Sequence, residues 1–165
     1  MIITLLTHAT ELHKPSNTGV ITHRRLSNFP EAQCHRVIWQ RKQPDPALLQ
    51  RLGALSSGLL YPSPTAIPLT NHSALELPEH LVLIDSTWQQ ARKIVNHSPY
   101  LQSLPAYSLN TDTPSRFTLR RNQVAGGLCT LETVTELARL QKLPQLAEAL
   151  ERDLDQLLAQ AHHGR

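Results

Sequence analysis

The stretch His80-Leu-Val-Leu-Ile-Asp-Ser-Thr-Trp-Gln-Gln-Ala-Arg-Lys93 decides the fold class. Its first part, Leu81 to Ile84, is a continuous apolar run, which is typical of a central strand in a parallel sheet because such a strand is buried on both faces. Its second part predicts a helix, since Ser86 and Gln89 have the spacing of a capping box. A strand followed at once by a helix is the repeating unit of an α/β fold.

The rest of the chain repeats this alternation. Apolar or β-branched runs predict strands at residues 2–7, 34–40, 58–61, 106–109 and 116–119, and periodic segments predict helices at 17–26, 46–55, 130–140 and 145–161. We therefore expect one α/β domain over residues 1–165, with a mostly parallel sheet flanked by helices. Its core is expected over residues 2–142, and residues 145–161 are expected to form an amphipathic C-terminal helix.

Composition excludes several classes of protein. The chain has 165 residues, 40% apolar and 18% charged, which is too apolar for a disordered chain. Two cysteines, Cys34 and Cys129, are too few for a disulfide scaffold or a four-cysteine zinc site. No apolar run reaches about 18 residues, and the first residues lack the features of a signal peptide. We expect a soluble, cytoplasmic protein that neither spans nor binds a membrane.

The net charge of +3 is unevenly distributed. Residues 1–125 contain 12 Lys and Arg and 7 Asp and Glu, whereas residues 126–165 contain 4 and 6. A basic first part favours an anionic partner such as RNA, although many basic proteins bind no nucleic acid.

The common catalytic motifs are absent. The sequence contains no G-x-G-x-x-G, no P-loop, no H-E-x-x-H, no C-x-x-C and no G-x-S-x-G. This argues against Rossmann dinucleotide binding, P-loop hydrolysis, the common zinc hydrolases and the α/β-hydrolase elbow.

Asp85 is the first candidate functional residue. It ends the most apolar strand, at the sheet edge where α/β proteins bind ligands, and a carboxylate there can orient or deprotonate a substrate. The alternative is that residues 85–87 only cap the following helix. Trp88 either shields Asp85 or belongs to the core.

Gly126 and Gly127 either expose backbone amides to a ligand before the next helix or only form a tight turn.

Basic residues form the second group of candidates. They would contact phosphate groups if the fold gathers them, and would otherwise be a scattered solvated set: Arg24, Arg25, Arg92, Lys93, Arg116, Arg120 and Arg121. His13 and Lys14 lie in a separate polar loop after the first strand, which is either a site or a solvated loop.

Taken together, the ordered segments resemble one family. The D-x-T-W element is Asp85-Ser86-Thr87-Trp88, and it is accompanied by His13–Gly19, Leu59–Pro62, Arg116–Leu119 and Leu128–Thr133. In order and spacing, from about residue 2 to 142, this set resembles the DTW-domain family, which is similar to the tRNA-uridine aminocarboxypropyltransferases.

The resemblance implies a fold and an activity. The fold would be SPOUT-like, with a C-terminal trefoil knot. The donor would be S-adenosylmethionine, with no metal, and the partner would be tRNA rather than DNA. The reaction would transfer the 3-amino-3-carboxypropyl group to N3 of a uridine and release methylthioadenosine.

The resemblance also implies residue roles. Asp85, Thr87 and Trp88 would be catalytic. The residues that would bind substrate are His13, Lys14, Arg92, Lys93, Arg116 and Arg120. The donor would be bound largely through backbone groups of Thr18, Leu60, Tyr61, Pro62, Leu119, Leu128, Thr130 and Leu131.

Alternatives remain open at this point. Many members carry a cysteine-rich zinc segment before the first strand, where this chain begins, so we expect weaker tRNA capture, a different substrate or the need for a partner. A SPOUT-type RNA methyltransferase would use the same donor, and a non-catalytic RNA-binding module would keep only the scaffold. The sequence does not determine whether the chain forms oligomers, and a monomer is the favoured expectation.

Overall fold

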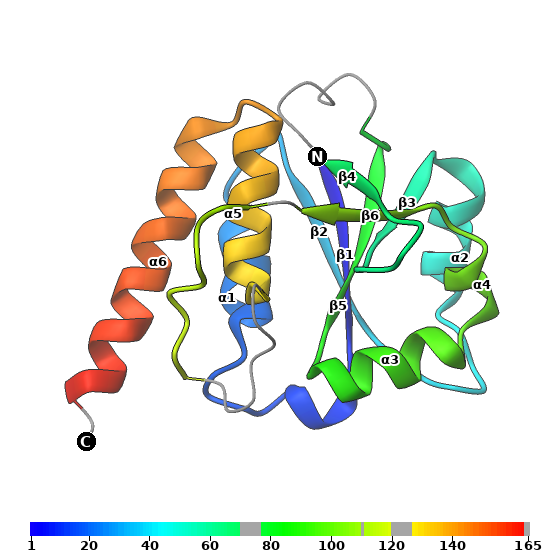
Figure 1. Ribbon diagram of the computed structural model, residues 1–165, viewed down its shortest axis with the longest axis horizontal. Helices are drawn as coiled ribbons and strands as arrows, with labels where there is room; N and C mark the ends of the chain where they lie inside the picture. The colour runs from blue at the N-terminus through cyan, green and yellow to red at the C-terminus, as the bar shows by residue number, and fades with distance from the viewer. Residues whose placement is uncertain (70–76, 110, 120–126, 164–165) are drawn as a thin grey trace.

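A computed structural model describes residues 1–69, 77–109, 111–119 and 127–163 (Figure 1). The strands are β1 (Ile2–Thr7), β2 (Gln33–Ile38), β3 (Ser57–Leu60), β4 (Ile67–Leu69), β5 (His80–Asp85) and β6 (Ala106–Leu109). The helices are α1 (Thr18–Leu26), α2 (Pro46–Ala54), α3 (Trp88–Asn96), α4 (Pro99–Gln102), α5 (Thr130–Leu140) and α6 (Pro144–His163), with a short 3-10 helix, η1 (Ala9–Glu11).

The strands form one parallel sheet in the order β2-β1-β5-β3-β6-β4. The register places Thr7 of β1 beside Ile38 of β2 and Asp85 of β5, so these three strands end at the same level. The chain leaves β1 toward β2, whereas it leaves β5 in the opposite direction toward β6. The predicted single α/β domain with a parallel sheet is therefore confirmed.

Alternating side chains divide the core between the two faces of the sheet. Ile3 and Leu5 pack in one cluster with residues of α1, α5 and α6, whereas Leu6 and Val82 pack in a second cluster with residues of α2, α3 and α4. Figure 1 shows the two groups of helices on opposite sides of the strands. No described helix has the length and apolarity needed to cross a membrane.

Two predicted helix starts are confirmed by their caps. The side chain of Asn17 accepts a hydrogen bond from the backbone N–H of Gly19 at 2.8 Å and caps α1. Asp45 accepts from the N–H of Leu48 at 2.8 Å and caps α2, whose first residue is Pro46. Both follow the usual preference for Asn, Asp and proline at these positions.

The capping box of α3 lies one residue later than expected. Thr87, not Ser86, is the N-cap: its hydroxyl accepts from the N–H of Gln90 at 3.3 Å, while Gln90 accepts from the N–H of Thr87 at 3.0 Å. The prediction was wrong because Ser86 and Thr87 are both good caps, and the strand runs on through Asp85.

The segment expected as a strand at 116–119 is irregular. Its backbone bonds to a side chain rather than to the sheet, since the N–H of Arg116 donates to Glu132 at 2.6 Å. The sequence reading also missed β4, which contains Pro68 and lies at the edge of the sheet, where a missing N–H is tolerated. The connection from β6 to α5 includes residues 110 and 120–126, which lie outside the described residues, so the SPOUT class and the knot remain predictions.

His80 lies inside the sheet, at the end opposite to the carboxyl edge. It is fully buried, and its ring nitrogens contact Thr4 Oγ1 at 2.8 Å and Ser57 Oγ at 2.9 Å. Burial lowers the pKa of His80 from 6.5 to about 4, with a further contribution from Arg51. The histidine therefore folds in its neutral form.

We expect His80 to make stability depend on pH between 6.5 and 4. In this window the unfolded chain binds a proton that the folded chain does not, so the free energy of unfolding decreases as the pH falls, by about 1.4 kcal/mol per unit at most. Urea unfolding of the protein and of His80→Gln across this range would test it. The variant should lose less stability on acidification, and parallel pH profiles would contradict the assignment.

Candidate functional site

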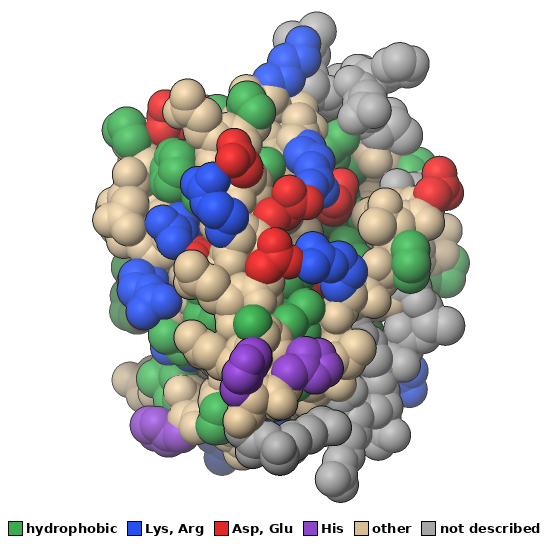
Figure 2. Space-filling view, turned by 90° about the vertical axis from the view of Figure 1, so that its left-hand side faces the viewer, with side chains coloured by type: hydrophobic (Ala, Val, Ile, Leu, Met, Phe, Trp, Pro, Cys, Tyr) green, Lys and Arg blue, Asp and Glu red, His purple; other side chains and the backbone are tan. Residues whose placement is uncertain are grey.

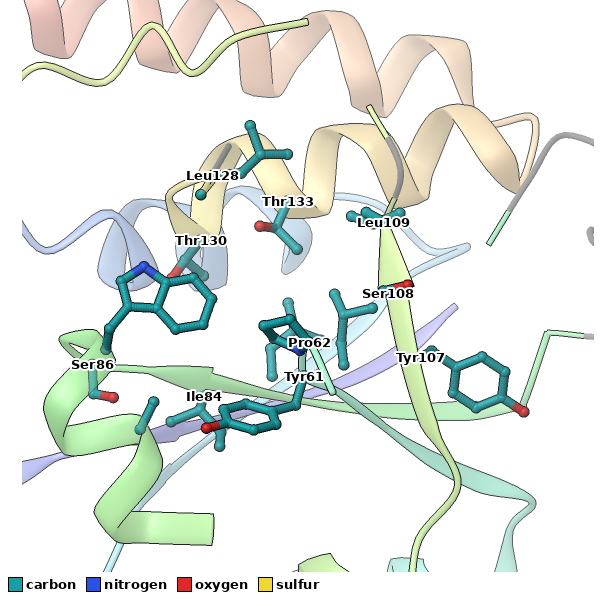
Figure 3. A pocket seen from close by; sticks show the side chains of 15 residues that line it. Tyr61, Pro62, Ile84, Ser86, Tyr107, Ser108, Leu109, Leu128, Thr130 and Thr133 are labelled. Atoms are coloured by element: carbon teal, nitrogen blue, oxygen red, sulfur yellow. The ribbon is translucent and has the colours of Figure 1, made fainter. Parts of the chain in front are cut away.

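A cavity opens at the carboxyl edge of the sheet and measures about 260 Å³. Its lining comes from four segments: residues 60–62 at the end of β3 and just beyond it, the end of β5 with the start of α3, residues 107–109 of β6, and residues 127–133 at the start of α5. Figure 3 shows Tyr61, Pro62 and Ile84 on one side and Leu128, Thr130 and Thr133 on the other. Ligands in open α/β sheets occupy this kind of position.

The wall chemistry favours a partly apolar organic ligand. The cavity is lined by Leu, Ile, Pro and aromatic side chains together with a few hydroxyl groups, and none of the lining residues that the structure describes is charged. Its volume lies just below the about 300–1000 Å³ usual for small-molecule sites, so a larger ligand would remain partly exposed.

Asp85 lies directly behind the cavity wall. It is fully buried, and it is not among the residues that line the cavity. Its Oδ1 accepts a hydrogen bond from the Thr130 hydroxyl at 3.0 Å, and its Oδ2 accepts from the Thr7 hydroxyl at 3.3 Å. The carboxylate thus joins β1, β5 and the first residue of α5, and it supports the cavity through Thr130.

The start of α1 closes over the same carboxylate. A Cβ added at Gly19 would lie 2.2 Å from Asp85 Oδ2 and 2.7 Å from its Cγ, so only glycine allows the helix to approach this closely. Asp85 therefore lies at the N-terminal ends of α1 and α5, where the helix dipoles stabilise a negative charge.

Glu132 fixes the turn that leads into α5. Its Oε2 accepts from the N–H of Cys129 at 2.9 Å and from the hydroxyl of Ser115 at 2.7 Å, while its Oε1 accepts from the N–H of Arg116. Through these bonds, the buried carboxylate of Glu132 connects residues 115–116 to the turn that contributes Leu128 to the cavity.

Comparison with known proteins identifies the family. The family model described as the DTW domain matches residues 1–162, nearly the whole chain. The chain belongs to the DTW-domain family. No solved structure matches it significantly.

One curated protein is also similar to this chain. It is the tRNA-uridine aminocarboxypropyltransferase 2 of Drosophila melanogaster, 42% identical over 102 residues. The match covers 60% of this chain and 40% of the relative, so the chain corresponds to less than half of that protein.

The family motif lies at the edge of the cavity. Trp88 lines it, together with Ser86, while Thr87 caps α3 and Asp85 lies behind the wall. The four residues of the motif therefore have three kinds of position: Asp85 is a buried support, Ser86 and Trp88 form part of the wall, and Thr87 is a helix cap.

Five of the eight expected donor residues line the cavity: Leu60, Tyr61, Pro62, Leu128 and Thr130. The other three do not. Thr18 and Leu131 are fully buried, and Leu119 packs at the margin of the core. Sequence reading missed Tyr107, Ser108 and Thr133, although 106–109 was recognised as a strand whose carboxyl end would reach this edge.

None of the expected basic residues that the structure describes lines the cavity. Lys14 bonds to Glu11 at 2.5 Å, and Arg116 pairs with Asp155, so both cations are already neutralised by carboxylates. His13, Arg92 and Lys93 are exposed and line no part of the cavity. Arg120 and Gly126 lie outside the described residues.

The two cysteines are unsuited to nucleophilic chemistry. Burial raises the pKa of the thiols of Cys34 and Cys129 to about 12, so both are protonated at neutral pH. Within the described ranges, no group of three or more His, Cys, Asp or Glu could hold a metal ion.

Proposed function

We propose that the protein transfers the 3-amino-3-carboxypropyl group of S-adenosylmethionine to N3 of a uridine in tRNA. The new bond joins N3 to the γ-carbon of that group, the carbon–sulfur bond breaks, and methylthioadenosine and the N3 proton are released. The observation that supports this most directly is the position of the D-x-T-W motif, which borders a partly apolar cavity at the carboxyl edge and supports it through Asp85 and Thr130. The name of the curated relative points to the same reaction.

The cavity fits the nucleoside end of this donor. Aromatic and apolar side chains of Tyr61, Pro62 and Leu128 would contact a flat base. No lysine or arginine is found among the described residues of the wall, which suits a ligand that carries a sulfonium cation. Trp88 would lie against that cation. SPOUT-like knotting of the β6–α5 connection, which would place these walls together, is part of the proposal.

Asp85 would act through Thr130. Because the Thr130 hydroxyl gives its proton to Asp85 Oδ1, its oxygen is left as an acceptor at the cavity wall. That oxygen can hold the N3–H of a uridine in line with the donor, which supplies the orientation that transfer requires. A fully buried carboxylate therefore polarises the wall without touching the substrate.

The uridine must be unpaired when it reaches the site. N3 is the atom that uridine uses in base pairing, so it is accessible only in a loop or after flipping. A uridine in a tRNA loop meets this requirement, and a cytoplasmic protein would encounter tRNA.

Donor binding and product identity test the proposal. S-adenosylmethionine is expected to bind the purified protein in calorimetry and to raise its melting temperature. Incubation with tRNA should release methylthioadenosine. Release of S-adenosylhomocysteine would instead indicate a methyltransferase, and a folded protein that binds no donor would indicate a non-catalytic RNA-binding module.

A further inference from the structure

A stacked pair of rings lies beside the cavity, on the other half of the carboxyl edge. His8 follows β1 and Trp39 follows β2, and their ring centroids are 6.2 Å apart with planes inclined by 25°. The N–H of Trp39 donates to Thr7 O at 2.9 Å, and its indole N–H donates to Ser98 Oγ at 2.8 Å. Both side chains are half-buried, and the adjoining Ile38 is 46% exposed.

The D-x-T-W helix holds this pair in place. Gln90, the partner of Thr87 in the capping box, uses its amide nitrogen to donate to Thr10 Oγ1 at 2.7 Å. Thr10 in turn contacts His8 Nδ1 through its hydroxyl at 2.8 Å and its backbone N–H at 3.3 Å. The imidazole is therefore oriented before any ligand arrives, which reduces the entropy cost of stacking against it.

Unpaired cations follow directly along the chain. Between Gln33 and Arg51 there are four Lys or Arg and one carboxylate, Asp45. Arg41 and Lys42 are exposed, and neither forms an ion pair with any described residue. Asp45 accepts the N–H of Leu48 as the cap of α2.

The face over α6 has the opposite character. Figure 2 shows its Lys and Arg side chains interspersed with Asp and Glu. Arg139 is paired with Glu136 and Glu151, Arg152 with Glu148, and Arg25 binds Asp153 through two nitrogens. A polyanion would gain little on that face, because its cations are already paired.

We propose that His8, Trp39, Arg41 and Lys42 form a binding subsite for single-stranded RNA, in which a base three or four nucleotides from the target uridine stacks on the His8–Trp39 pair and its phosphates contact the two cations. This rests on the proposed function. Adjacent strands are about 4.8 Å apart, so the pair at β1 and β2 lies about 10–15 Å from the cavity at β5, β3 and β6. Stacked nucleotides repeat every ~3.4 Å, so three or four of them span this distance.

Fluorescence provides a direct measurement of stacking. The chain has two tryptophans, so Trp88→Phe leaves Trp39 as the reporter. We expect a short oligouridylate to quench Trp39 and to bind with an affinity that falls as salt increases. An emission unchanged at saturating RNA would overturn the proposal.

Matched variants separate stacking from packing. Trp39→Leu and His8→Ala should each weaken oligouridylate binding about tenfold, since stacking on an aromatic ring contributes about 1–3 kcal/mol. Trp39→Phe keeps an aromatic ring but loses the bond to Ser98, so it should retain binding even if its melting temperature falls. Equal weakening by Phe and Leu would show a structural role and contradict the subsite.

Charge variants test the phosphate contacts. Arg41→Ala and Lys42→Ala should each reduce the slope of log affinity against log salt by about one, whereas Arg152→Ala, on the paired face, should leave it unchanged. A protein that binds S-adenosylmethionine and RNA with no effect of these variants would refute the subsite alone. A protein that binds no RNA at all would refute both the subsite and the proposed function.

Discussion

Replacement of Gly19 by alanine is expected to inactivate the protein and to destabilise it by about 3 kcal/mol. The new methyl group would lie 2.2 Å from Asp85 Oδ2, which is much shorter than a van der Waals contact. The carboxylate cannot move freely, because Thr7 and Thr130 hold its two oxygens inside the fold. Either α1 moves away or the two hydrogen bonds break, and the cavity wall at Thr130 shifts in both cases. Urea unfolding and transfer assays would measure the two effects.

The same substitution elsewhere in the chain provides the control. Gly53 lies in α2, and an added Cβ would have no atom within 4 Å. Gly53→Ala should therefore be neutral or stabilising by up to about 1 kcal/mol, because alanine favours the helix. A Gly19→Ala protein with the stability and activity of Gly53→Ala would show that Asp85 does not lie under α1 as described.

The second large effect is expected from removal of the Asp85 charge. Asp85→Asn keeps the shape of the side chain, and its amide can still bond to both hydroxyls, so the fold should survive. The Thr130 oxygen would no longer be polarised by a full negative charge, and we expect turnover to fall about a hundredfold or more, with donor affinity changed only a few-fold. Asp85→Ala should abolish transfer and also reduce stability, since it leaves Thr7 and Thr130 without their buried acceptor.

Variants of Thr130 test the route from Asp85 to the cavity. Thr130→Ser keeps the hydroxyl and should retain most of the turnover, whereas Thr130→Val keeps the volume but removes the hydroxyl and should resemble Asp85→Asn. If Thr130→Val were fully active while Asp85→Asn was inactive, Asp85 would act by another route than the one proposed.

The strand pattern could be predicted well because it depends on local sequence. The runs at 2–7, 81–84 and 106–109 lie within strands of the structure, and the helices expected at 17–26 and 46–55 correspond to α1 and α2. The segment at 116–119 was mistaken for a strand because its β-branched and aromatic residues resemble one. Its Phe117 is instead buried in the core, and its backbone is held by Glu132, a contact between segments that no local pattern reveals.

Part of the candidate site was also predictable. The motif at 85–88 lies at the cavity because the carboxyl ends of parallel strands meet at one edge, whereas the loops at 60–62 and 128–130 were expected there from the resemblance to the DTW-domain family. The basic residues could not be assigned in this way. Whether Arg116 or Arg41 is available to an anion depends on which carboxylates the fold brings near it, and Arg116 has Asp155 beside it.

Sequence alone determined the class of fold, the family and the strand that carries Asp85, because hydrophobic periodicity, capping residues and an ordered motif are properties of the chain. Tertiary structure alone decided that Asp85 is buried behind Thr130, that Gly19 must lack a side chain, and that His8 stacks on Trp39. These facts depend on distances between segments that lie far apart in the sequence. Such distances are set by the packing of helices against the sheet, which no local pattern encodes.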